Sequence, residues 1–236
     1  MSEREIGHVV ALFRYPVKSM CGEALRSVMV GWAGFAGDRR WAFVRAGMER
    51  SDFPWLTIRE RPEMWQYVPR FADPEKPDSS VTLVRTPSGE ELDVVDEALA
   101  AELGSGARVI KQGRGIFDAL PLSLISTQTV DALGGYAGAQ LDPRRFRPNI
   151  LFEAIDGSAF SEDACVSNTL RIGDMRMRVD KRDKRCVVTN VDPTTTAKNP
   201  EVLRAIARER QNFLGVYGST VQTGTIAVGD SILIES

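Results

Sequence analysis

Residues 81–95 read VTLVRTPSGEELDVV, and this stretch decides the fold class. Two short runs, 81–84 and 92–95, are rich in apolar and β-branched residues and flank Pro87-Ser88-Gly89. Proline fixes one backbone angle of a turn, and glycine accepts angles that other residues avoid. The stretch therefore predicts a β-hairpin within a meander of antiparallel strands.

Further strands are predicted on both sides of this hairpin. Short apolar or alternating runs bounded by turn residues are typical of strands. These runs are 6–12, 41–44, 121–125, 175–179 and the pair 226–228 and 232–234 around Gly229-Asp230. The last pair predicts a closing hairpin, and the alternating Met175, Met177 and Val179 predict a buried strand face.

Three helices are predicted from their capping residues. One runs from Asp96 to Leu103, a second follows Ser126 and ends at Gly134-Gly135, and a third starts at Asn199-Pro200. Because strands and helices do not alternate regularly, the order predicts a mainly β, barrel-like fold with a few helices. The segment Gly104-Ser105-Gly106 predicts a boundary between two β-rich parts, residues 1–105 and 106–236.

Composition limits the classes of partner. The 236 residues include 30 Lys and Arg against 32 Asp and Glu, so we expect no general attraction to nucleic acid or to an anionic membrane. No apolar run reaches the roughly 18 residues of a membrane-spanning helix, and no signal peptide is evident at the start. The sequence therefore predicts a soluble, cytoplasmic protein.

The three cysteines, Cys21, Cys165 and Cys186, form no CxxC pair, which argues against a disulfide framework, a zinc site or an iron–sulfur cluster. Cys186 follows the basic run 181–185, and neighbouring positive charge favours the thiolate that acts as a nucleophile or soft-metal ligand. The alternative is a buried cysteine that opens a strand at Val187-Val188. Cys21 and Cys165 are interpreted as packing residues.

Several basic residues stand beside turns rather than on helix faces. They lie in Lys18-Ser19, Asp38-Arg39, Thr57-Ile58-Arg59 and the run 144–149. Arginine suits phosphate, and the hydroxyls of Ser126 and Thr127 at a helix start offer further donors. Anion capture is one interpretation, and ordinary surface arginines are the other, because sequence spacing does not show whether the residues converge.

Five segments together resemble the MOSC domain family with its N-terminal β-barrel domain, a group that includes the mitochondrial amidoxime-reducing component. They are Tyr15-Pro16-Val17-Lys18-Ser19, Gly37-Asp38-Arg39, Phe146-Arg147-Pro148-Asn149, residues 185–193 (RCVVTNVDP) and residues 224–230 (GTIAVGD). The resemblance implies an N-terminal MOSC-type β-barrel over residues 1–105 and a MOSC domain over 106–236.

The resemblance also implies a molybdenum cofactor of the molybdopterin type, held between the two parts. Cys186 matches the family's metal ligand, and flanking Lys184 and Arg185 would favour its thiolate. The residues that match cofactor-binding positions are Lys18, Ser19, Arg39, Ser126, Thr127, Arg147 and Asn149. Thr57 and Arg59 match a Thr-x-Arg segment of the family and are secondary candidates.

By the same resemblance, the expected activity is reduction of N-hydroxylated substrates. We expect electrons from a separate ferredoxin- or flavin-type donor protein, because the chain lacks clustered cysteines. The alternative is a non-catalytic carrier of the cofactor, or of a persulfide on Cys186, that works with a cofactor-delivery protein. The sequence departs from the family at Thr194-Thr195-Thr196, where relatives often have Asp-Thr-Gly, and at Cys165, where they usually have Trp.

Overall fold

The computed structural model describes residues 3–235, which form sixteen strands, three α-helices and four short 3-10 helices. The first nine strands are β1 (Glu3–Arg14), β2 (Glu23–Leu25), β3 (Ser27–Gly31), β4 (Gly34–Phe35), β5 (Trp41–Val44), β6 (Val68–Phe71), β7 (Thr82–Arg85), β8 (Glu91–Asp93) and β9 (Arg108–Lys111). The others are β10 (Leu122–Ser126), β11 (Ile150–Ala154), β12 (Thr169–Ile172), β13 (Met175–Lys184), β14 (Phe213–Gln222), β15 (Gly224–Ala227) and β16 (Ser231–Glu235).

The helices are α1 (Glu97–Leu103), α2 (Thr127–Ala137) and α3 (Pro200–Arg210), with 3-10 helices at Pro62–Gln66, Pro143–Phe146, Ser161–Cys165 and Val187–Asn190. The predicted caps of α1 and α3 are confirmed, because the side chains of Asp96 and Asn199 accept bonds from the first-turn amides. Among the described residues, no helix combines the length and apolar character needed to cross a membrane.

Seven strands close into a barrel in the order β11, β10, β14, β13, β12, β16 and β1, and β1 pairs back to β11. All neighbours are antiparallel except β10 and β11. Apolar side chains fill the interior, as expected for a barrel this small. They include Val9, Leu12, Leu124, Phe152, Met175, Met177, Val179 and Ile232. The predicted β-barrel fold and the buried methionine face are confirmed.

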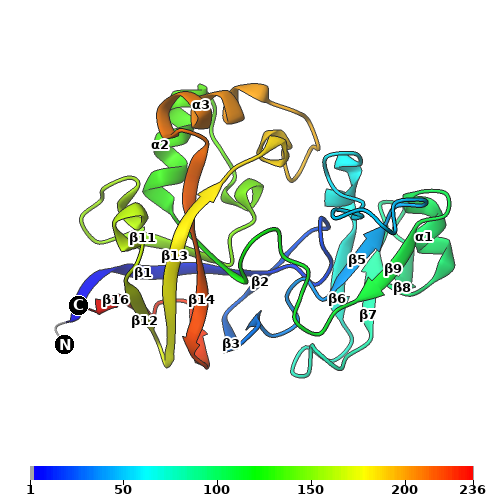
Figure 1. The fold of residues 1–236 in the computed structure, drawn as a ribbon, viewed down its shortest axis with the longest axis horizontal. Helices are drawn as coiled ribbons and strands as arrows, with labels where there is room; N and C mark the ends of the chain where they lie inside the picture. Colours follow the sequence, from blue (N-terminus) through cyan, green and yellow to red (C-terminus); the bar gives the residue numbers. More distant parts are fainter. Residues whose placement is uncertain (1–2, 236) are drawn as a thin grey trace.

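The smaller lobe holds the hairpin predicted at residues 81–95. Strands β7 and β8 pair antiparallel beside β6, and Gly89 takes the positive φ of 91° that the turn requires. Strands β5 and β9 form a ribbon, and α1 lies in the same lobe (Figure 1). The predicted hairpin is therefore confirmed.

The two lobes share strands. Strand β1 lies in the large barrel, although it comes first in the chain, and β3 pairs with β15 from the far end of the sequence. Figure 1 shows β1 and β2 running from the barrel toward the smaller lobe. The boundary at residue 105 stays a prediction, but the strand pairing crosses it.

The predicted closing hairpin over 226–234 is wrong. Strand β15 pairs with β3, whereas β16 pairs with β12 and β1, so the two segments belong to different sheets. The turn at Gly229-Asp230 is present, and Asp230 Oδ2 accepts a hydrogen bond from the Ala227 amide. A turn signal predicts a change of direction but does not identify the pairing partners of the strands on either side.

The predicted end of α2 at Gly134-Gly135 is also wrong. The helix continues to Ala137 and ends at Gly138, which has a left-handed φ of 65°. A side chain at Gly134 would meet the Ala139 carbonyl oxygen at 2.8 Å, so this glycine lets the chain return close to the helix. The strand considered at Val187-Val188 is a 3-10 turn instead.

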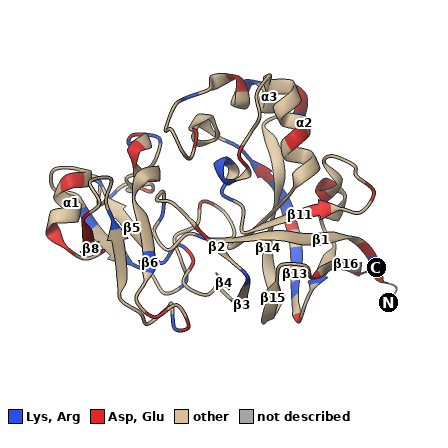
Figure 2. Ribbon diagram, turned by 180° about the vertical axis from the view of Figure 1, so that it is seen from behind, with Lys and Arg blue, Asp and Glu red and all other residues tan. Residues whose placement is uncertain are grey.

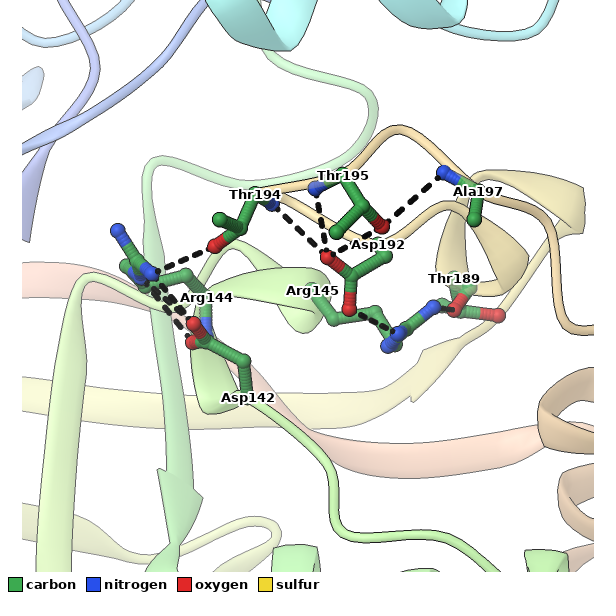
Figure 3. Close-up of polar contacts among 8 residues, drawn as sticks. All are labelled: Asp142, Arg144, Arg145, Thr189, Asp192, Thr194, Thr195 and Ala197. Atoms are coloured by element: carbon green, nitrogen blue, oxygen red, sulfur yellow. Dashed lines mark hydrogen bonds and ion pairs between the residues drawn. The ribbon is translucent and has the colours of Figure 1, made fainter.

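A polar network fixes the loop that follows this turn (Figure 3). Asp192 Oδ1 accepts bonds from the amides of Thr194 and Thr195 at 3.0 and 2.9 Å, and its Oδ2 accepts one from Arg145 at 2.8 Å. The buried Arg145 also donates to the Thr189 carbonyl at 3.2 Å. The network therefore ties the turn after Cys186 to the 3-10 helix Pro143–Phe146.

Ser126 links β10 to α2 in a buried cluster. Its Oγ accepts the Thr129 amide at 3.1 Å and lies 3.1 Å from the carboxylate of Glu162. We expect Ser126→Ala to lower the free energy of unfolding by about 2 kcal/mol, because both the helix cap and a donor to a buried carboxylate are lost. Urea unfolding measures this loss. The exposed Ser158→Ala serves as the control, and equal stability of the two variants would contradict this role.

Thr196 adopts a left-handed φ of 60°, which is costly for a β-branched residue. We expect Thr196→Gly to raise the free energy of unfolding by up to about 1 kcal/mol, because relief of strain outweighs the greater freedom of unfolded glycine. Thr194 in the same loop has no positive φ. Thr194→Gly should therefore lower stability in the same urea titration, and a loss in both variants would disprove strain at Thr196.

Candidate functional site

One cavity of about 340 Å³ is lined by residues from both lobes. Nine of its 24 lining residues are basic, and four aromatic residues, Phe53, Phe117, Phe146 and Tyr217, also line it. The basic residues are Lys18, Arg39, Arg59, Arg145, Arg147, Lys181, Arg182, Lys184 and Arg185. Figure 2 shows Lys and Arg concentrated along β13, which supplies part of this wall. The volume is in the range typical of small-molecule sites.

Cys186 lies in this cavity wall, where β13 ends and the turn Val187–Asn190 begins. Its side chain is half-buried, and Arg59 Nη2 lies 3.4 Å from its Sγ. This contact joins residues 127 positions apart. The hydrogen bond to Cys186 raises the pKa of Arg59, so the guanidinium stays charged beside the thiol.

Arg185, the expected neighbour of the thiol, points elsewhere. Its guanidinium donates to the carbonyls of Leu214 at 2.7 Å and Phe146 at 2.9 Å. These bonds attach the end of β13 to two other elements and fix the backbone immediately before Cys186. The cation that contacts the thiol is therefore Arg59, which the sequence ranked only as a secondary candidate.

Arg39 and Arg147 meet at the ring of Tyr15. Their guanidinium carbons lie 4.7 and 4.1 Å from the ring centroid, and Arg147 also lies 4.8 Å from the centroid of Trp65. Arg39 Nη2 donates to the Arg147 carbonyl at 3.0 Å. The two side chains are thus held together by aromatic contacts and by a direct hydrogen bond.

Arg147 has a buried donor without a partner, as do the cavity residues Arg145 and Arg182. Its Nη1 donates to the Met20 carbonyl at 2.7 Å, but its buried Nη2 has no hydrogen-bond partner. Burial lowers the pKa of Arg147 to about 10, which still leaves it charged at neutral pH. A buried charged donor without a partner is costly, so this atom is suited to an anionic ligand.

Lys18 lines the cavity beside Asp118. The buried Nζ forms an ion pair with Asp118 Oδ1 at 2.5 Å and donates to the Ile116 carbonyl at 3.2 Å. Burial lowers the pKa of Lys18, and Asp118 partly offsets that effect. Desolvation opposes ionisation of Asp118, but the charge of Lys18 prevails and lowers the pKa of this carboxyl.

Three site residues have left-handed backbone conformations: Ser19, Arg39 and Arg147, with φ of 70°, 50° and 52°. Non-glycine residues seldom adopt such angles, and they concentrate at binding sites. Asn149 helps to hold Arg39 in its position. Its Nδ2 donates to Asp38 Oδ2 and its Oδ1 lies 3.4 Å from Arg39 Nη1, so it acts on the site by positioning Arg39.

The cavity brings together most of the residues that the sequence proposed. Lys18, Ser19, Arg39, Arg147, Asn149 and Cys186 all line it, together with Thr57 and Arg59. Ser126 and Thr127 do not line it. Ser126 is instead buried at the start of α2, bonded to Thr129 and Glu162, which gives it a structural role.

The sequence analysis missed three polar residues of the cavity: Asp118, Asp183 and Tyr217. Asp183 interrupts the basic run before Cys186, and that interruption was the one available signal. The other two cysteines lie outside the cavity lining. Burial raises the pKa of Cys165 to about 11, as expected for a packing residue.

Comparison with known proteins gives two family matches. The MOSC N-terminal beta barrel domain matches residues 6–112, and the MOSC domain matches residues 112–233. The chain is 30% identical over 128 residues to mitochondrial amidoxime reducing component 2 of Rattus norvegicus, and 28% identical over 130 residues to mitochondrial amidoxime-reducing component 1 of Homo sapiens. These matches cover 49% and 50% of this chain but 37% of each relative.

A solved structure is similar over the whole chain. The YUAD protein from Bacillus subtilis superposes with a TM-score of 0.55 at 12% identity, covering 100% of this chain and 98% of that one. This likeness concerns the fold. The two family matches, which together span residues 6–233, lead to one conclusion: the chain belongs to the MOSC domain family.

Proposed function

We propose that this protein binds a molybdenum cofactor and reduces N-hydroxylated small molecules. The observation that carries the proposal is the convergence of one thiol, Cys186, with the cations Lys18, Arg39, Arg59 and Arg147 in a single cavity. A soft sulfur ligand beside a set of phosphate-binding cations suits a thiophilic metal carried by a phosphorylated organic group. The family is associated with this cofactor.

The side chains of the cavity fit a molybdenum cofactor of this type. Cys186 would supply the protein's ligand to the metal, while Lys18, Arg39 and Arg147 would neutralise the phosphate. The unpaired Nη2 of Arg147 is the donor that a phosphate oxygen would complete. Ser19 would contribute a hydroxyl at the pterin, with Asn149 positioning Arg39. When bound, the cofactor supplies two-electron redox chemistry, and the protein supplies its orientation and charge balance.

The choice of substrate class rests on the relatives. Two of them are named as amidoxime-reducing components, and an amidoxime carries an N-hydroxyl group. A separate donor protein of the ferredoxin or flavin type would deliver the electrons. Since the relatives are matched over 37% of their length, their activity is carried over here as a proposal.

A cofactor or persulfide carrier is the second candidate, and the half-exposed thiol of Cys186 favours it, because a partner protein can reach such a sulfur. Protein expressed with a complete cofactor pathway allows the reductase to be distinguished from the carrier. The assay measures molybdenum per chain, and then reduction of benzamidoxime and of an N-hydroxylated base by a chemical reductant. Molybdenum without any turnover supports the cofactor carrier. A chain without molybdenum contradicts both the reductase and the cofactor carrier, and leaves only the persulfide carrier.

We expect Cys186→Ala to abolish N-hydroxyl reduction and to change the metal's X-ray absorption spectrum through loss of a sulfur ligand. Folding should stay intact, because the side chain lies at a cavity wall rather than in the core. Cys165→Ala, at a buried position away from the cavity, should keep activity. Wild-type turnover by Cys186→Ala would refute the assignment of this thiol.

We expect Arg147→Gln to lower molybdenum retention by about tenfold or more, since a charged donor to phosphate contributes at least about 1.5 kcal/mol. Arg144→Gln is the matched control, because Arg144 pairs with Asp142 and lies outside the cavity lining. Molybdenum per chain after extended dialysis, with a thermal melt on each variant, measures the difference. Equal retention in both variants would remove Arg147 from the site.

A further inference from the structure

Asp183 lies in the cavity wall and has a buried carboxyl group. The cofactor-binding proposal gives this residue no role. It is 2% exposed and lies on β13, three residues before Cys186. Carboxylates are almost never buried this deeply unless they are paired with cations or metals. A carboxyl buried beside the cavity's cations therefore points to a function for Asp183.

The groups around Asp183 are not enough to hold it fully ionised. Arg185 Nη1 lies 2.8 Å from Asp183 Oδ2, but this oxygen accepts no hydrogen bond of good geometry. Arg185 instead directs hydrogen bonds to two backbone carbonyls. Burial raises the pKa of Asp183 to about 6, although the charge of Arg185, the hydroxyl of Tyr217 on β14 and the charge of Arg39 favour the ionised form. Asp118 opposes ionisation as well.

The second cavity carboxyl, Asp118, has the opposite environment. Its side chain is 56% exposed and forms an ion pair with Lys18, which lowers its pKa. One cavity therefore holds a carboxylate that stays ionised and a carboxyl that can carry a proton near neutral pH. Pairs of acids whose surroundings separate their pKa values in this way divide into charge stabiliser and proton donor.

We propose that Asp183 is the proton donor of this cavity, and that it protonates the oxygen released when an N-hydroxylated substrate is reduced. The inference rests on the proposed function. The reaction is R–NH–OH + 2 e⁻ + 2 H⁺ → R–NH₂ + H₂O, in which the N–O bond breaks and the external reductant supplies both electrons. Asp183 gives one proton to the departing oxygen, and water supplies the other.

The neighbouring hydroxyl of Tyr217 completes the arrangement. Burial raises the pKa of Tyr217, so its hydroxyl stays protonated over the working pH range. After proton transfer, the Asp183 carboxylate is stabilised by this hydroxyl and by Arg185 until a proton returns from water. Asp183 thus acts as a general acid, whereas Arg185 and Tyr217 are positioning residues.

The first test is the pH profile of turnover by molybdenum-loaded protein with benzamidoxime and a chemical reductant. Wild-type kcat should fall as pH rises through about 6, because the acid form is required. Asp183→Asn should lower kcat about 100-fold and remove this limb of the profile, while Asp183→Glu restores part of the rate. The control is Asp180→Asn on the same strand, where the carboxylate bonds Ser219 outside the cavity lining.

The outcomes separate the inference from the proposed function. If Asp183→Asn keeps the wild-type kcat and the same pH limb, the inference is wrong and the proposed function stands. If the loaded wild type reduces no N-hydroxylated compound, both fall together. A kcat loss at every pH with the limb retained would mean that Asp183 acts only through structure, which also overturns the proposal.

The second test needs no cofactor. The folded-state pKa of about 6 lies above the unfolded value of 3.8, so the folded chain binds an extra proton between these values. The stability contributed by Asp183 is therefore present at low pH and lost as pH rises from about 4 to 6. Urea unfolding of the full chain should show wild type losing stability relative to Asp183→Asn over that range. A difference that stays constant with pH would mean that Asp183 is always ionised, and would overturn the proposal.

Discussion

Strand β1 closes the barrel, and the rest of the structure depends on that closure. It pairs with β11 on one side and β16 on the other, with Gly7 directly opposite Ala154 and Ile232. A side chain at Gly7 would meet the Glu153 carbonyl oxygen at 2.1 Å, so only glycine permits this approach. Because the barrel partners of β1 begin at residues 150 and 231, the barrel closes only when these distant segments meet.

The closure also builds the cavity. The chain that leaves β1 carries Lys18 and Ser19 to the same wall as the end of β13, where Cys186 lies. Asn149, just before β11, donates to the Phe13 carbonyl and to Asp38, and so ties the end of β1 to Arg39. The strand order of the barrel and the position of the cavity's cations therefore have a common cause.

The site is built at an energetic cost. Positive charges of Arg39 and Arg147 share one aromatic ring, Arg147 keeps a buried donor without a partner, and three backbone positions are left-handed. Such features lower the stability of a chain without ligand. Binding of an anion is favoured, because it would pair with the free donor and balance the positive charge. The carboxyls of Asp118 and Asp183 balance part of the charge, one at the exposed rim and one in the buried wall.

The sequence by itself determined the local structure. Strand runs, the turn at Gly89 and the caps Asp96 and Asn199 depend on residues a few positions apart, so their pattern is visible in the chain. Matching of motifs also pointed to Lys18, Arg39, Arg147 and Cys186, which the cavity brings together.

Only the tertiary structure decided which strands pair, as the separation of β15 from β16 shows, since hydrogen-bond partners come from distant segments. It likewise placed Arg59 at the thiol, Ser126 in a buried cap and Asp183 in the cavity wall. These roles depend on burial and on contacts across more than 30 residues, and no spacing in the sequence encodes them.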